Sequence, residues 1–267
     1  MHTSIILRRT SIVVLLLLIA SVVAAPGLIG QIINGVPVQT GQSIPMQIQT
    51  LLLQGDNESK RGNFDQAIAY YTKAMELDPQ SAPIYLRRGD AYSGKGDYEH
   101  AISDYTRALN FEPNFGSAYF KRGAIFEERG EFDSAIADFS SAIQLNPSMA
   151  EAFHRRGVIH YKIGNTDQAT ADLEKSIQLE PVHAESYLYR GLVRAKMNEF
   201  DSALADFGRA IQLNPDFGEA YLTRGVIYEA MGEKAEAITD LKKALKLLSD
   251  PQAREFVAQH LRTLEEE

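Results

Sequence analysis

The stretch "GSAYFKRGAIFEERGEFDSAIADFSSAIQLNPSM" (residues 116–149) carries the pattern that decides the fold of this chain. Tyr119, Gly123 and Phe126 have the i, i+4, i+7 spacing of one helix face. Past a glycine that can end a helix in the left-handed conformation, a second face with that spacing follows at Ala135, Phe139 and Ala142. Pro147 then stops the second helix, because proline cannot continue one. The stretch therefore predicts a helical hairpin.

The same pattern recurs along the chain with a period of 34 residues, marked by prolines at Pro79, Pro113, Pro147, Pro181 and Pro215. The turn between the two helices of each unit is predicted at Gly62, Gly96, Gly130, Gly164, Asn198 and Gly232. Six units result, at residues 48–81, 82–115, 116–149, 150–183, 184–217 and 218–251. Residues 252–267 place Val257, Leu261 and Leu264 on one face, which predicts a helix that caps the last unit.

An arginine precedes the glycine of the first helix in five units, and an aspartate stands sixteen residues after that arginine, as in Arg122 and Asp138. The first unit has Gln54 and Tyr70 instead, so both members are absent together. This joint presence favours a contact between helices, made within a hairpin or with the next one. The alternative is a row of arginines that binds phosphates or nucleic acid. The glycine itself predicts a close approach of a neighbouring helix, because glycine otherwise weakens a helix. That neighbour is either the second helix of the same hairpin or an adjoining repeat.

The pattern of an aromatic, Gly and an aromatic, followed by Ala, an aromatic, Ala and Pro, resembles the tetratricopeptide repeat (TPR) family. Six tandem units carry the resemblance, which implies an all-α, right-handed α-solenoid of six helix-turn-helix hairpins with a C-terminal capping helix. The first unit departs from the family pattern, with Leu51 and Glu58 at positions where aromatics are usual.

The resemblance also implies a groove, formed by the first helices, that takes an extended segment or a helix of a partner protein. Projected onto this sequence, the candidate groove residues are Leu86, Asp90, Phe120, Glu127, His154, Val158, Tyr161, Lys162, Leu188, Leu192, Lys196 and Leu222. They predict an apolar floor with acidic borders, suited to an apolar or mildly basic segment. Alternatively, the leucines and valines only seal neighbouring hairpins. His154 and Tyr161 are the preferred contacts, since the repeat pattern demands neither. The lysine–asparagine clamp of one TPR subclass is missing from the central groove positions.

The N-terminal segment, residues 1–33, has Arg8 and Arg9 before an uncharged apolar run. It predicts either a cleaved signal peptide or an uncleaved transmembrane anchor, with the body outside the cytoplasm in both cases. Residues 34–47 are uncharged and rich in Gly, Pro, Gln, Ser and Thr, which predicts a flexible linker.

Composition narrows the classes of function. The net charge is -8, and the first 47 residues hold only two positive charges, so the repeats are acidic and unsuited to nucleic acid. There is no cysteine, and no histidine pair has a recognised metal spacing. We therefore expect no cofactor, no metal and no catalysis, but a protein-binding scaffold outside the cytoplasm, either anchored in the membrane or secreted or periplasmic after cleavage. A subunit that assembles through its ends or outer faces is the alternative, and an envelope binder of polysaccharide or lipid is a third.

Overall fold

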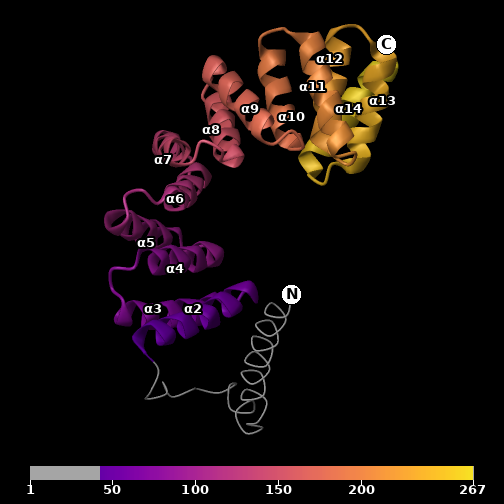
Figure 1. Cartoon of the computed structure of the whole chain (residues 1–267). Helices are drawn as coiled ribbons and strands as arrows, with labels where there is room; N and C mark the ends of the chain where they lie inside the picture. Colours follow the sequence, from indigo (N-terminus) through magenta and orange to yellow (C-terminus); the bar gives the residue numbers. More distant parts are fainter. Residues whose placement is uncertain (1–42, 267) are drawn as a thin grey trace, which may run out of the picture. The chain divides into compact units, whose positions relative to one another are not determined.

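The computed structural model describes residues 43–266, and in that range it is all helical, with no strand. Thirteen helices follow one another in the described range (Figure 1), namely α2 (Ile44–Lys60), α3 (Phe64–Leu77), α4 (Ala82–Lys95), α5 (Tyr98–Phe111), α6 (Gly116–Glu128), α7 (Phe132–Leu145), α8 (Ala150–Lys162), α9 (Thr166–Leu179), α10 (Ala184–Lys196), α11 (Phe200–Leu213), α12 (Gly218–Ala230), α13 (Lys234–Leu247) and α14 (Pro251–Glu266). The predicted all-α solenoid is confirmed.

The solenoid forms one compact unit that begins at Leu51. Helix α2 begins at Ile44, inside the linker predicted for residues 34–47. The remainder of that linker, and the signal peptide or anchor predicted for residues 1–33, lie outside the described residues. Within residues 43–266, no helix has both the length and the apolar character needed to cross a membrane.

Each hairpin turns at a residue with positive φ, and these are the six turn residues that the sequence predicts. Five are glycines, with φ between 72° and 86°, and the sixth is Asn198 with φ 62°. A Cβ added at Gly62, Gly96, Gly130 or Gly232 would meet no atom within 4 Å, so glycine is needed there for its backbone conformation alone. The turns therefore follow from local chemistry.

Some glycines within the helices are required because a side chain there would clash with a neighbouring helix. A Cβ on Gly89 would lie 2.6 Å from Cε1 of Tyr105, and one on Gly191 would lie 2.5 Å from Cε1 of Phe207. In both cases the aromatic ring belongs to the second helix of the same hairpin. The sequence predicted a close approach by that helix or by an adjoining repeat, and the structure selects the former.

Every predicted arginine–aspartate pair closes within its own hairpin. Nε and Nη2 of Arg122 on α6 each donate to one carboxylate oxygen of Asp138 on α7, at 2.8 Å. The other four pairs repeat this two-point contact at 2.6–2.9 Å, in Arg88–Asp104, Arg156–Asp172, Arg190–Asp206 and Arg224–Asp240. All five aspartates are buried. These arginines are thus committed to ion pairs, and the interpretation of a row that binds phosphates is wrong.

Three of these five arginines also link successive hairpins. Nη1 of Arg122 donates to the hydroxyl of Thr106 on α5, and Nη1 of Arg88 donates to Thr72 on α3. Arg156 does so with Ser140 on α7 at 2.8 Å. One guanidinium group therefore fixes the two helices of its hairpin and the second helix of the preceding hairpin.

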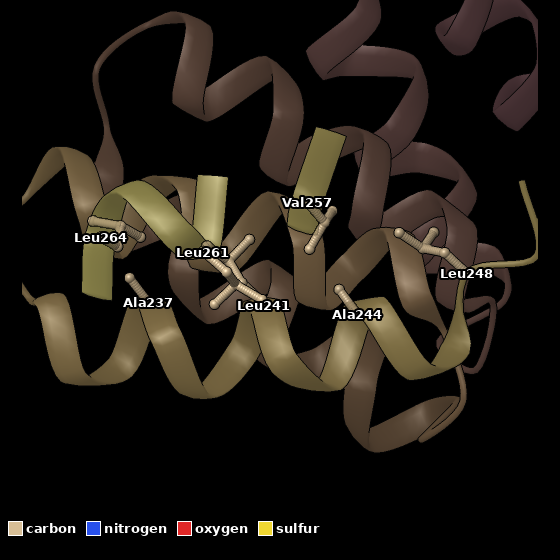
Figure 2. Packing of buried hydrophobic residues seen from close by; sticks show 7 residues of the cluster. All are labelled: Ala237, Leu241, Ala244, Leu248, Val257, Leu261 and Leu264. Atoms are coloured by element: carbon tan, nitrogen blue, oxygen red, sulfur yellow. The ribbon is translucent and has the colours of Figure 1, made fainter. Parts of the chain in front are cut away.

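The last hairpin is covered by α14, as predicted. Val257, Leu261 and Leu264 of α14 pack on Ala237, Leu241, Ala244 and Leu248 of α13 and the residue after it (Figure 2). All seven residues are buried. Helix α14 therefore seals an apolar face that a further repeat would otherwise cover.

Candidate functional site

All twelve predicted groove residues lie on the first helices α4, α6, α8, α10 and α12, which contact one another in that order. We call the surface that these five helices form the first-helix face. The side chains of Lys162 and Lys196 are exposed there. Seven others are half-buried, namely Leu86, Asp90, Phe120, Glu127, Tyr161, Leu192 and Leu222.

The remaining three, His154, Val158 and Leu188, are buried inside the solenoid. Leu188 packs in the apolar cluster around Phe207 and Ala220, which is the sealing role that the sequence left open as an alternative. His154 is 5% exposed and so offers a partner little surface, although the sequence marked it as a preferred contact. Its partner-binding role stays a prediction that burial disfavours.

Two predicted residues, Asp90 and Phe120, come together in one pocket of about 280 Å³. The pocket lies between α4 and α6 over α5, and it is lined by Asp90, Ser93, Tyr105, Phe120, Lys121, Ala124, Ile125 and Glu128. Phe120 supplies an aromatic wall that is held by Phe139, with the two ring centroids 5.7 Å apart. The pocket therefore has a fixed apolar side and a polar rim.

Asp90 is held in place by two partners. The hydroxyl of Tyr105 donates to it at 2.8 Å, and Nζ of Lys121 lies 3.1 Å from the same oxygen. Burial and the neighbouring Asp90 carboxylate raise the pKa of Tyr105, so the phenol stays protonated and keeps donating. Tyr71 and Asp56 repeat this arrangement one hairpin earlier, at 2.7 Å.

A second column of the first-helix face, which the sequence did not predict, is formed by the residue two positions before each helical glycine. Arg87, Lys121 and Arg155 stand there, and each pairs with an acid one hairpin earlier, Asp56, Asp90 and Glu127 respectively. In the next hairpin the column changes to Tyr189, whose ring lies 6.0 Å from that of Tyr161 and 5.9 Å from that of His154. The doublets "RRG", "KRG" and "RRG" were the available signal. The face thus runs from ionic to aromatic along the chain.

A polar cluster lies beneath that aromatic part. Nδ1 of His154 is 3.0 Å from the hydroxyl of Ser186, which is also 2.7 Å from Nδ1 of His183 and 3.0 Å from the hydroxyl of Ser176. Burial lowers the pKa of His154 to about 3, with smaller contributions from His183 and Arg155. Its imidazole is therefore neutral near pH 7.

Among residues 43–266, one group of side chains could hold a metal ion: His154, His183 and Glu185, of which one ligand atom each lies within 4.8 Å of the others. From the sequence, a metal-binding pair was weighed only for His154 and His160, which lie six residues apart on one helix. His183 was missed, because that residue belongs to the next hairpin and reaches His154 only when α8 and α10 pack together.

Models of known families match the repeats. Models described as "TPR repeat" match residues 55–96, 89–128 and 123–164, and models described as "Tetratricopeptide repeat" match residues 150–183, 184–217 and 218–251. No curated protein matches the sequence of the chain significantly.

Several solved structures are similar to the chain. A crystal structure of MamA is 32% identical, with a TM-score of 0.56 over 59% of this chain and 92% of MamA. YrrB, described as "a TPR protein with an unusual peptide-binding site", is 22% identical with a TM-score of 0.62, over 72% of this chain and 97% of its own. The pilF protein of Pseudomonas aeruginosa is 19% identical with a TM-score of 0.71, over 82% of this chain and 100% of its own. The last two show the fold alone.

Proposed function

Because this chain belongs to the tetratricopeptide repeat family, we propose that it is a non-catalytic scaffold that binds a segment of a partner protein on its first-helix face. The repeats and the similar TPR structures support protein binding as the general role. YrrB, which shares the fold, is described as having a peptide-binding site, and this supports a peptide or helix as the ligand.

The observation that carries the proposal is the pocket of about 280 Å³ between α4 and α6. An aromatic wall beside a few fixed polar groups is the usual composition of a site that takes one side chain of a ligand. Phe120 cannot swing away, because it packs on Phe139. The pocket is thus preformed, which lowers the cost of ordering when a ligand binds.

The charge of the pocket indicates which kind of partner segment it would bind. Asp90 is paired with Lys121, whereas Glu128 on the exposed rim accepts a hydrogen bond from Tyr98 and forms no salt bridge among the residues described. A carboxylate without a cationic partner, beside an apolar wall, favours a ligand side chain that is apolar along its length with a positive end. The preferred ligand is therefore an extended or helical segment with alternating apolar and basic residues.

Panning a random peptide library on the immobilised protein tests this proposal. We expect enriched peptides to combine apolar and basic residues. Glu128→Arg should weaken their affinity at least tenfold, because it puts a positive charge on the rim. Glu236→Arg is the matched control, because Glu236 is equally exposed but lies on the second helix α13. If no peptide is enriched, or if both variants bind equally well, the first-helix face is not the binding surface.

We place the scaffold outside the cytoplasm on the sequence of residues 1–33 alone. Arg8 and Arg9 before an apolar run are typical of export, either with cleavage or with retention as a membrane anchor. A reporter enzyme that is active only outside the cytoplasm, fused after residue 267, should be active. Activity of a reporter that works only inside would contradict the export.

Assembly through the N-terminal end of the solenoid is the second candidate. Leu53 on α2 is 60% exposed, in the one hairpin that lacks the arginine–aspartate pair. If this surface joined two copies, light scattering would report an oligomer that Leu53→Glu converts to a monomer. A monomer at all concentrations would remove this candidate.

A further inference from the structure

Two histidines and two glutamates meet where α8 contacts α10. Glu151 and His154 lie on α8, His183 precedes the first turn of α10, and Glu185 lies within that turn. Nε2 of His154 is 3.6 Å from Glu185, and Nε2 of His183 is 3.8 Å from Glu151. Both imidazoles therefore direct the same nitrogen toward a carboxylate.

Two serines behind the imidazoles fix where the protons lie. Nδ1 of His183 accepts from the backbone N–H of Ser186 at 3.3 Å, so that nitrogen carries no proton. The hydroxyl of Ser186, 2.7 Å from it, must then donate to it. Since this uses the single proton of Ser186, Nδ1 of His154 donates to the oxygen of Ser186 and the hydroxyl of Ser176 does the same. Among neutral forms of the two imidazoles, this assignment satisfies all four contacts together.

It follows that Nε2 of His154 bears a lone pair and not a proton. That nitrogen makes no hydrogen bond within the part of the chain described, since 3.6 Å to Glu185 is too long for one. A lone pair and a carboxylate thus face each other across a short gap, although the ring itself is buried. Such a pair of bases repels unless a cation lies between them.

We propose that His154, His183 and Glu185 bind one divalent transition-metal ion of the Zn²⁺ class. Imidazole and carboxylate ligands without thiolate suit Zn²⁺ and its first-row neighbours better than Mg²⁺ or Ca²⁺, which prefer oxygen alone. Two neutral imidazoles with the carboxylates of Glu185 and Glu151 give a donor set of charge -2, which matches the ion. Glu151 is the fourth ligand, through the oxygen that Arg155 leaves free.

The ligand atoms need to move only a short distance toward one another to form a metal site. Bonds of about 2 Å in a tetrahedral site put ligand atoms roughly 3.3 Å apart. The three candidate atoms already lie within 4.8 Å of one another, and the side chain of Glu185 is 61% exposed and free to turn inward. When Nε2 of His183 binds the metal, its proton moves to Nδ1, which gives up its contact with the backbone N–H of Ser186 and donates to the hydroxyl oxygen of Ser186. Ser186 then turns its hydroxyl to Ser176, whose own proton turns away from Ser186. No proton is lost, and both Nδ1 atoms are held by one serine, as orienting groups hold metal-binding histidines elsewhere.

Calorimetric titration of the full chain, freed of metal with a chelator, tests the site. We expect one equivalent of Zn²⁺ to bind and Mg²⁺ to give no saturable heat. Glu185→Gln and His183→Asn should each weaken Zn²⁺ binding at least tenfold. Asparagine is chosen because it can still cap α10, so the variant keeps its fold.

His260→Ala is the matched control, because His260 pairs with Glu229 in another histidine–glutamate contact far along the chain. It should bind Zn²⁺ as the wild type does. The proposal is overturned if wild type binds no Zn²⁺, if Mg²⁺ binds equally well, or if the two site variants retain the affinity of wild type. A loss of binding in His260→Ala equal to that in Glu185→Gln would also overturn it.

Discussion

The buried ion pair of Arg122 and Asp138 should show strong energetic coupling in a double-mutant cycle. Asp138 is 5% exposed and accepts from Nε and Nη2 of Arg122 at 2.8 Å. Removing one partner of a buried pair leaves the other charge without compensation, which costs about 3–5 kcal/mol. The guanidinium of Arg122 also lies 5.8 Å from the ring of Tyr119, and this packing is lost when the side chain is truncated.

The two single variants should lose different amounts of the free energy of unfolding. Arg122→Ala leaves a buried carboxylate, so we expect a loss of about 3 kcal/mol in the free energy of unfolding. Asp138→Ala leaves a guanidinium that still donates to Thr106 and reaches solvent, so we expect about 2 kcal/mol. The double variant should lose about 3 kcal/mol and not the sum of about 5, because neither charge remains to be buried alone. The coupling would then be about 2 kcal/mol.

Equilibrium unfolding in urea, followed by far-ultraviolet circular dichroism, measures all four proteins. The control is the exposed pair Lys95–Asp65, for which the same cycle should give no measurable coupling. Additive losses for Arg122 and Asp138, with a coupling below about 0.5 kcal/mol, would refute the structural role of the pair.

Four further substitutions test the fold by thermal or urea unfolding. Gly89→Ala should destabilise the protein by about 1–3 kcal/mol, because the added Cβ would meet the Tyr105 ring at 2.6 Å. Gly208→Ala should be neutral or stabilising, because the added Cβ would meet only Arg224, at 3.7 Å. Equal effects of the two substitutions would contradict the idea that Gly89 is required by the close approach of the Tyr105 ring. Asn198→Gly should stabilise by about 0.5 kcal/mol, because glycine adopts its φ of 62° more easily, and a loss would show that the Asn198 side chain matters. Leu261→Asp should lower the free energy of unfolding by about 3 kcal/mol. It should also promote association of the protein by uncovering the apolar face of α13, which light scattering would detect. A protein that stays monomeric and equally stable would contradict the capping role of α14.

The sequence by itself determined the hairpins, their number and their turns. Their signals are local: an apolar face at i, i+4, i+7 forms a helix, a glycine or Asn198 with positive φ ends it, and a proline prevents continuation. The joint absence of Arg and Asp from the first hairpin also favoured a contact between these two residues, and the structure showed that this contact closes within one hairpin.

Only the tertiary structure decided what lies between hairpins. The rotation of one hairpin on the next sets which side chains of α8 meet those of α10, and no local periodicity encodes that angle. It buried His154 and brought His183 to it, and it aligned Arg87, Lys121 and Arg155 with the acids of the preceding hairpin. Helices and turns follow from contacts near in sequence, whereas the candidate surface and the histidine cluster depend on packing between repeats.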